Sequence, residues 1–335
     1  MSSPQIQTTV VGSYPIPDWL PTARSVEAVR DATLAVLKTQ ENAGVDVISD
    51  GELSRFDINH PETNGMIDYF LGPMDGIDIE PTFAEIREFQ AGKVGEYRKE
   101  PAAILRSELS DGRLNLVRDW EFVRALTSHR LKFTCTGPHM LAKVVVDKHY
   151  GDQRSLAMAI AEILRCQIAE IDAPVVQLDE ANIPGSPEEA PWAAEAMNHV
   201  LSAVQGIRAV HVCFGNYGGQ TIQSGHWSKL LVYLNALDTN HLVLECARRS
   251  PDEVSLLKDV RSEIGLGIGV IDIKDNAVET PEAVADAIDR VAKAVGGAER
   301  IHYVHPDCGF WMLSRSVADR KMESLVRGRD LFEGR

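Results

Sequence analysis

Short apolar runs alternate with longer amphipathic stretches along most of this chain. Apolar residues recur at helical spacing over residues 25–44, 155–172, 187–206, 250–261 and 281–297. Eight runs rich in β-branched residues have the length of strands, and they cover residues 7–13, 45–49, 131–137, 174–180, 208–214, 241–245, 266–272 and 300–307. This alternation of strand and helix predicts an α/β fold, a (β/α)8 TIM barrel.

Residues 53–130 interrupt the alternation. The segment is mixed and polar, and it is too long for one loop and one helix. We therefore expect a long insertion after the second strand, built of helices and a hairpin, that lies over the barrel mouth. Because no linker-like stretch separates it from the rest, we expect residues 1–335 to form one catalytic domain.

Local signals support the helix boundaries. Ser250 and Thr280 each precede a proline and an acidic residue, which is typical of a helix start. Gly44 and the pair 296–297 stand where helices are expected to stop. The repeated glycines of GLGIG in 265–269 are interpreted as part of a closely packed strand rather than as a dinucleotide-binding loop.

Composition and charge narrow the function classes. A net charge of −15 disfavours nucleic acid or an anionic membrane as a partner, because both attract basic surfaces. No apolar run approaches the roughly 18 residues of a membrane span, and the N-terminus lacks a signal-peptide pattern, so we expect a cytoplasmic protein. The five cysteines are widely spaced, which favours a reducing compartment over disulfides. Cys135 and Cys166 are expected in the core.

Four potential metal ligands follow the later strands. His211 and Cys213 are two residues apart on one predicted strand and therefore share a face. Glu245 and Cys308 come at the ends of two further strands, and barrels carry their active sites at the carboxyl ends of strands. A single buried cysteine is usually a small apolar core residue. Recurrence at three strand ends predicts instead one Zn²⁺ site, since zinc accepts this ligand set tetrahedrally.

At these residues the chain resembles the catalytic C-terminal domain of cobalamin-independent methionine synthase. The combination of HxC, a following LE and PDCG is specific, and the segments occur in order across most of the chain. They are TTVVGSYP (8–15), SDGELSRFD (49–57), QLDE (177–180), HVC (211–213), LE (244–245), GVIDI (269–273) and HPDCG (305–309). The resemblance implies a single-barrel form of this enzyme, a methyltransferase of methionine biosynthesis, with His211, Cys213, Glu245 and Cys308 as zinc ligands.

The resemblance also implies the substrate, L-homocysteine, whose thiol receives a methyl group to form methionine. Its family contacts correspond to Gly12, Ser13, Glu52 and Asp179. Carboxylates suit an ammonium group, and a turn with free N–H groups and a hydroxyl suits a carboxylate. Zinc with two thiolate ligands would keep the bound substrate thiol nucleophilic near neutral pH.

One departure from the family concerns the methyl donor. Folate-using members have DIHSP after the seventh strand, where this chain has DIKDN with Lys274. A lysine, with a pKa near about 10.4, is poorly matched to protonating a departing folate nitrogen. Lys274 is thus a weak catalytic candidate that could equally pair with Asp272 or Asp275. The sequence favours methylcobalamin or a methylated corrinoid protein as donor, with methyltetrahydrofolate as the competitor.

Two alternatives stay open. The same barrel and metal would serve alkyl transfer to another thiol such as coenzyme M, although Glu52 and Asp179 suit an amino-acid thiol better than a sulfonate. A protein that binds zinc or a thiol without catalysis is the other alternative. Structural zinc usually joins closely spaced cysteines, whereas these ligands come from separate strands.

Overall fold

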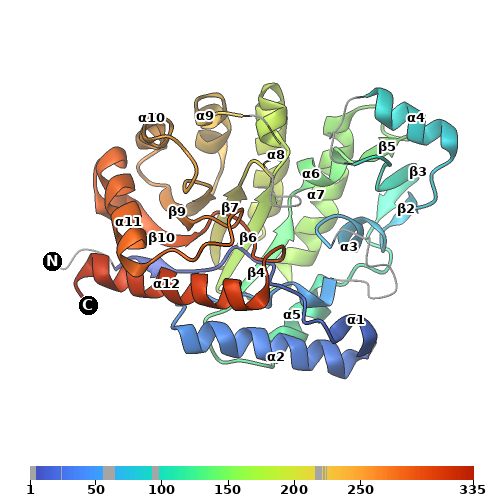
Figure 1. Ribbon diagram of the computed structural model, residues 1–335. Helices are drawn as coiled ribbons and strands as arrows, with labels where there is room; N and C mark the ends of the chain where they lie inside the picture. The colour runs from blue at the N-terminus through green and yellow to red at the C-terminus, as the bar shows by residue number, and fades with distance from the viewer. Residues whose placement is uncertain are drawn as a thin grey trace.

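The computed structural model describes residues 5–23, 25–55, 65–92, 98–215, 221, 223 and 225–335. Its main sheet has seven strands in the order β1-β10-β9-β8-β7-β6-β4, and every neighbouring pair is parallel (Figure 1). The strands are β1 (Gln7–Thr8), β4 (Lys132–Thr136), β6 (Val175–Glu180), β7 (Ile207–Val212), β8 (His241–Leu244), β9 (Gly265–Ile271) and β10 (Ile301–Pro306). The predicted parallel α/β class is confirmed.

The predicted strand over residues 45–49 is the main difference in the sheet. It makes two isolated parallel bridges, Thr9 to Val47 and Ile48 to Leu131, and no continuous strand. Gly44 and Gly51 both have positive φ, so the backbone turns on either side of this segment and leaves few residues extended. The two bridges nevertheless connect the residues beside β1 with those beside β4, the two edges of the sheet.

Helices alternate with the strands and lie outside them (Figure 1). Ser250 and Thr280 cap their helices as predicted, and Gly44 and Gly296 end theirs in the left-handed conformation. The sequence analysis did not identify α9 or α12, and charged residues dilute the apolar spacing of α12. These helices are α1 (Leu20–Ala23), α2 (Val26–Ala43), α6 (Pro138–Ala142), α7 (Gln153–Ala169), α8 (Ala190–Leu201), α9 (Trp227–Ala236), α10 (Pro251–Ser255), α11 (Pro281–Val295) and α12 (Arg315–Glu333).

The segment 53–130 contains both helices and strands. Its two strands pair antiparallel, but α4 separates them along the chain, so they do not form the tight hairpin that was expected. A third strand, β5 (Val145–Asp147), comes from beyond the segment and pairs parallel with β3. The elements are α3 (Asp68–Leu71), β2 (Asp75–Asp78), α4 (Phe83–Ala91), β3 (Ala103–Ser110) and α5 (Leu116–Arg124).

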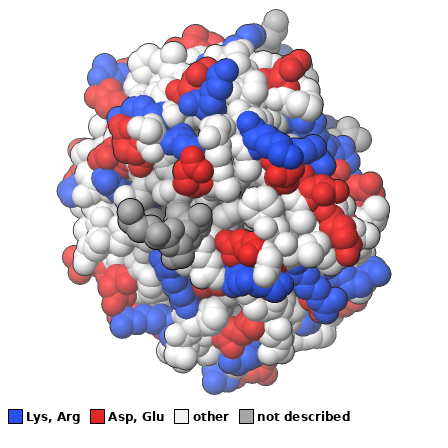
Figure 2. Space-filling model, turned by 90° about the vertical axis from the view of Figure 1, so that its left-hand side faces the viewer, with Lys and Arg blue, Asp and Glu red and all other residues white. Residues whose placement is uncertain are grey.

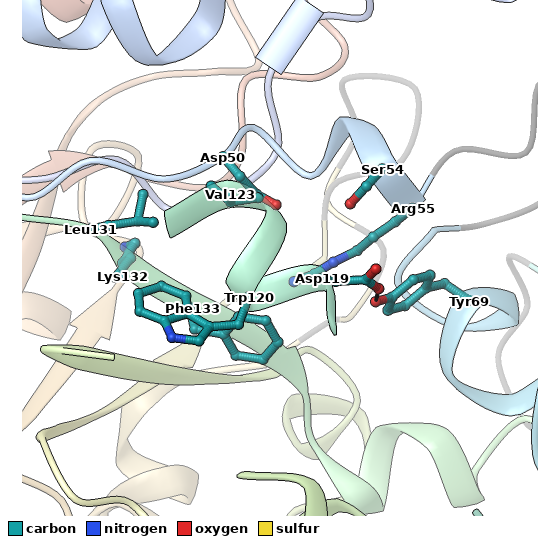
Figure 3. A pocket seen from close by; sticks show the side chains of 10 residues that line it. All are labelled: Asp50, Ser54, Arg55, Tyr69, Asp119, Trp120, Val123, Leu131, Lys132 and Phe133. Carbon is teal, nitrogen blue, oxygen red and sulfur yellow. Dashed lines mark hydrogen bonds between the residues drawn. The ribbon is translucent and has the colours of Figure 1, made fainter. Parts of the chain in front are cut away.

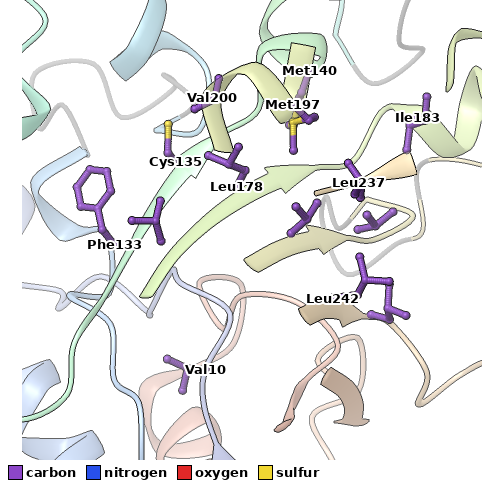
Figure 4. Close-up of a cluster of buried hydrophobic side chains, with 14 of the residues drawn as sticks. Val10, Phe133, Cys135, Met140, Leu178, Ile183, Met197, Val200, Leu237 and Leu242 are labelled. Carbon is purple, nitrogen blue, oxygen red and sulfur yellow. The ribbon is translucent and has the colours of Figure 1, made fainter. Parts of the chain in front are cut away.

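The core lies between the strands and the helices (Figure 4). Cys135 and Leu178 are fully buried there, and truncating such a leucine to alanine typically costs about 2–5 kcal/mol. The prediction that Cys166 belongs to the core is wrong. Cys166 lies on the solvent face of α7 beside Glu162 and Arg165, where its thiol is exposed.

The face of the molecule in Figure 2 carries charges of both signs. On the face in Figure 2, acidic and basic side chains are interspersed, and no large area carries one sign of charge. Among the described residues, no helix combines the length and the apolar character needed to cross a membrane.

Candidate metal and substrate site

The predicted site residues gather where the parallel strands end. Asp179 at the end of β6 pairs in register with His211 on β7, and His211 pairs with Val243 on β8. Glu245 follows β8 directly, and Cys308 lies two residues beyond β10. Parallel pairing therefore brings residues that are far apart in the sequence together at the carboxyl ends of the strands.

His211, Cys213 and Cys308 form a compact ligand cluster. One ligand atom from each lies within 4.8 Å of the others, and the two sulfur atoms are 3.9 Å apart. The Nδ1–H of His211 donates to the carbonyl of Val243 at 2.9 Å, which leaves Nε2 as a lone-pair donor. His211 Nε2 is buried and has no hydrogen-bond partner. An orphaned imidazole nitrogen beside two thiols fits a zinc ion.

The two thiols differ in their acidity. The hydrogen bond between the two sulfurs, helped by His211, holds the pKa of Cys308 well below its usual range. The same hydrogen bond, together with burial, raises the pKa of Cys213. Cys308 is therefore the thiol that ionises more readily to the thiolate, which is the form that binds metals.

Glu245, the predicted fourth ligand, is directed elsewhere. Its Oε1 lies 3.0 Å from Nζ of Lys274 and 3.4 Å from the guanidinium of Arg249. Its Oε2 accepts a 3.4 Å hydrogen bond from the backbone N–H of Phe214. Glu245 is not among the three residues whose ligand atoms converge. Its role as a zinc ligand stays a prediction.

Lys274 is buried and paired. Its amine contacts Glu245 rather than Asp272 or Asp275, so the alternative pairing from the sequence is not formed. Asp272 instead accepts the backbone N–H of Lys274 at 2.8 Å and binds Arg248 at 2.7 Å. The loop after β9 is therefore fixed at the position that carries the Lys274 amine.

Glu52 and Gly12 lie against each other. Glu52 has φ of 60°, the only positive value at a non-glycine residue in the described part of the chain. A Cβ at Gly12 would lie 2.2 Å from Oε1 of Glu52, so the missing side chain makes room for the carboxylate. The same Oε1 accepts a 2.7 Å hydrogen bond from Thr134. Burial and the nearby Asp50 raise the pKa of Glu52 against the opposing effect of Arg55.

Asp179 is the second acid of the site. Its Oδ1 accepts a hydrogen bond from Gln177 at 2.7 Å, and the Gln177 carbonyl accepts one from Lys132 at 2.7 Å. Burial and the carboxylate of Glu52 raise the pKa of Asp179 to about 7, although His211 and Lys132 oppose the shift. Lys132 and Gln177 were not identified from the sequence; the available signal was polar residues at inward positions of apolar strands.

Ser13 brings the first strand next to the last. Its carbonyl accepts the backbone N–H of Phe310 at 2.8 Å, and a Cβ at Gly309 would lie 2.0 Å from its Oγ. The turn at 12–13 thus contacts Glu52 on one side and the residue after Cys308 on the other. Ser13 therefore lies beside the residue that follows Cys308, as Asp179 lies beside His211.

A small separate pocket is lined by residues on either side of Glu52 in the sequence, Asp50 and Arg55 among them, and contains none of the predicted zinc ligands (Figure 3). Arg55 projects into it, bonded to Thr134 and stacked near the rings of Tyr69 and Phe133. Arg55 is also 3.5 Å from Glu52. The guanidinium of Arg55, which lines this pocket, is therefore the positive charge that pairs with Glu52.

Comparisons with known proteins agree with the residue pattern. A family model described as "Cobalamin-independent synthase, Catalytic domain" matches residues 6–328. Methionine synthase of Thermococcus kodakarensis is 30% identical, with 99% of this chain and 94% of the relative covered, and that of Sulfurisphaera tokodaii is 29% identical, with 97% and 92% covered.

Two solved structures share the fold. A B12-independent methionine synthase from Shewanella sp. W3-18-1, in complex with selenomethionine, superposes with a TM-score of 0.82 at 23% identity, covering 98% of both chains. A putative vitamin-B12 independent methionine synthase from Listeria monocytogenes gives a TM-score of 0.71 at 16% identity, also covering 98% of both chains. From the family model and the relatives, the chain belongs to the family of cobalamin-independent synthase catalytic domains, as its motifs indicated.

Proposed function

We propose that this protein is a zinc-dependent methyltransferase that moves a methyl group to the thiol of L-homocysteine and forms methionine. The observation that carries the proposal is that a soft-ligand cluster lies beside two acids that are largely shielded from solvent. His211, Cys213 and Cys308 supply the cluster, and Glu52 and Asp179 supply the acids. Methionine synthases among the relatives support the same reaction.

The chain's own residues would hold zinc in a defined way. Nε2 of His211 and the sulfurs of Cys213 and Cys308 give three ligands, and Glu245 is the candidate for a fourth. When bound, zinc would stabilise the substrate thiol as a nucleophilic thiolate. Two thiolate ligands reduce the charge on zinc, which disfavours a hydrolase that activates water.

The acids and the first turn would recognise the amino-acid end of the substrate. Asp179 is buried and the side chain of Glu52 is 10% exposed, and both carboxylates are suited to an ammonium group. Ser13 offers a hydroxyl, which suits the substrate carboxylate, and Gly12 makes room for the Glu52 side chain. Coenzyme M, which has a sulfonate and no ammonium, fits this pair of acids poorly.

Two methyl donors are each favoured by one observation. The family is described as cobalamin-independent, which favours methyltetrahydrofolate. Lys274, where folate-using members carry histidine, is paired with Glu245, which favours a donor whose leaving group needs no proton. That donor would be methylcobalamin or a methylated corrinoid protein, as the sequence favoured.

The test is a methyl-transfer assay with zinc-loaded protein, L-homocysteine and each donor in turn. Methionine formed with one donor, and lost in Cys308→Ser, would support the function and identify the donor class. Methylation of coenzyme M in preference to homocysteine would overturn the choice of acceptor.

We also infer the architecture that presents this site. The bridges at Val47 and Ile48 would close the parallel strands into an eight-membered (β/α)8 barrel. Residues 53–130 would then be the insertion at its mouth, and 1–335 one cytoplasmic catalytic domain.

A further inference from the structure

We propose that Lys274 and Arg249 form a cationic latch that holds Glu245 away from the metal cluster, so that this carboxylate exchanges between the metal and the latch. The inference rests on the proposed zinc site and adds a positioning role for Lys274. Entry of the substrate thiol would send Glu245 to the latch, and departure of the product would return it to the metal.

The contacts show a latch with its carboxylate in place. Oε1 of Glu245 lies 3.0 Å from Lys274 Nζ and 3.4 Å from Arg249. The side chains of Lys274 and Glu245 are each 1% exposed, so neither charge has water as an alternative partner. The counter-ion of the buried Lys274 ammonium is therefore Glu245, the predicted metal ligand.

Arg249 and the backbone of Lys274 are each held by groups other than Glu245. Arg249 lies 3.4 Å from the centre of the Phe214 ring and also pairs with Glu253 at 3.4 Å. The backbone of Lys274 is held through Asp272, which accepts the Lys274 N–H at 2.8 Å and whose own N–H donates to Glu279 at 2.9 Å. These supports leave rotation of the Glu245 side chain as the simplest way to change the arrangement.

Charge balance gives the exchange a physical reason. Zinc with two thiolates and a neutral imidazole carries no net charge, and a tetrahedral site then accepts one more ligand. Glu245 and a substrate thiolate would each add one negative charge. When the substrate thiolate occupies the fourth position, Lys274 neutralises the charge of the displaced Glu245. The site then does not carry two uncompensated negative charges.

The test compares metal binding in Lys274→Met, Lys274→Arg and wild type without any thiol. Chelator competition measures zinc affinity, and the visible spectrum of cobalt-substituted protein reports the ligand set. Lys274→Met removes the closer cation of the latch and leaves only Arg249, so Glu245 should stay on the metal more often, and the variant should bind zinc about tenfold more tightly and change the cobalt spectrum. Lys274→Arg should resemble wild type, as should Lys229→Met, a change at an exposed lysine on α9.

A second variant separates the latch from a general structural effect. Glu245→Gln in the Lys274→Met background should abolish the gain in zinc affinity, because the amide is a weak metal ligand. In the single variant Lys274→Met, Glu245 should compete with the substrate for the metal. Homocysteine should therefore perturb the cobalt spectrum of Lys274→Met only at a concentration about tenfold higher than wild type requires.

Unchanged zinc affinity and cobalt spectrum in Lys274→Met, or weaker binding that Lys274→Arg does not restore, would overturn the latch. If wild type binds zinc but not homocysteine, the proposed acceptor fails instead, while the thiol-free comparison still decides the latch.

Discussion

Two polar clusters include consecutive residues of β6, and they differ in how many of their polar atoms have a hydrogen-bond or ion-pair partner. Asp179 belongs to the candidate site with His211, Cys213 and Cys308. Glu180 belongs to a second group, which we call the paired cluster and which consists of His139, Lys143, Glu180 and Glu189. Side chains alternate along a strand, so neighbouring acids serve different surroundings.

Every charge of the paired cluster has a partner. His139 lies 3.0 Å from Glu180 and 2.8 Å from Glu189, and Lys143 binds Glu189 at 3.0 Å. The remaining oxygen of Glu180 accepts the backbone N–H groups of Asn182 and Ile183. Such a closed network stabilises the ends of the strands and leaves no atom for a ligand.

The candidate site, in contrast, leaves buried atoms without partners. Nε2 of His211 makes no hydrogen bond, and neither do Nε2 of His305 and Oδ2 of Asp307, which come shortly before Cys308 in the sequence. An unpaired buried polar group typically costs about 1–3 kcal/mol, so a fold retains such groups where a ligand completes them. Both clusters contain buried charged groups, so burial and charge do not tell them apart. Buried atoms without a hydrogen-bond partner distinguish the candidate functional cluster from the stabilising one.

The largest expected effect is that of Cys308→Ser. Removing the thiolate should lower zinc content and reduce methyl transfer by at least about a hundredfold. Metal analysis and the transfer assay measure both. Cys166→Ser, which changes an exposed cysteine far from the strand ends in the fold, is the matched control and should behave as wild type.

Glu180→Gln should mainly affect stability. Removing one carboxylate leaves the buried His139 imidazolium partly unpaired, which should lower the free energy of unfolding by about 3 kcal/mol. Denaturant unfolding measures the change, and homocysteine binding by the folded protein should remain within about twofold of wild type. A loss of binding without loss of stability would show that the two clusters do not have separate roles.

Asp179→Asn should show the opposite pattern. Loss of the carboxylate should weaken homocysteine binding about ten- to a hundredfold, with zinc content intact. Because burial disfavours the charged form of Asp179, the free energy of unfolding should not fall. Calorimetry and denaturant unfolding test the two parts, and unchanged affinity would remove Asp179 from substrate recognition.

The smallest effect is a pH dependence of stability. Burial opposes protonation of His139, but Glu180 and Glu189 outweigh it and raise its pKa to about 9, above the ordinary 6.5. The stability from this group is therefore fully present below pH 6.5 and is lost as pH rises through 9. Between pH 7 and 9, wild type should lose about 1–2 kcal/mol more than His139→Gln. If the free energies of unfolding of wild type and His139→Gln changed equally with pH, the ion pairs of His139 would not contribute to stability as described.

Most strands of the main sheet were accessible from sequence because they depend on local periodicity, and the three converging metal ligands were accessible from spacing and motif. His211 and Cys213 share a face through their spacing alone, and HPDCG identifies Cys308 as part of the same motif set. The direction of the Glu245 side chain was not accessible, since it depends on Lys274 from the next strand end.

Other features depended on distant pairing. The chain from Lys132 through Gln177 to Asp179 requires the register of β4 against β6, which no local pattern encodes. The addition of β5 to the small sheet and the shortening of 45–49 to two bridges have the same cause. Periodicity predicts which face a residue occupies, whereas its partner across the sheet depends on the whole fold.

The most direct test of the central claim is calorimetric titration of zinc-loaded protein with L-homocysteine, with coenzyme M as the comparison thiol and Cys308→Ser as the metal-site control. The proposed site predicts selective binding of homocysteine that is lost in Cys308→Ser. Binding of coenzyme M in preference, or of neither thiol, would contradict an amino-acid thiol site built from the metal cluster and the two acids.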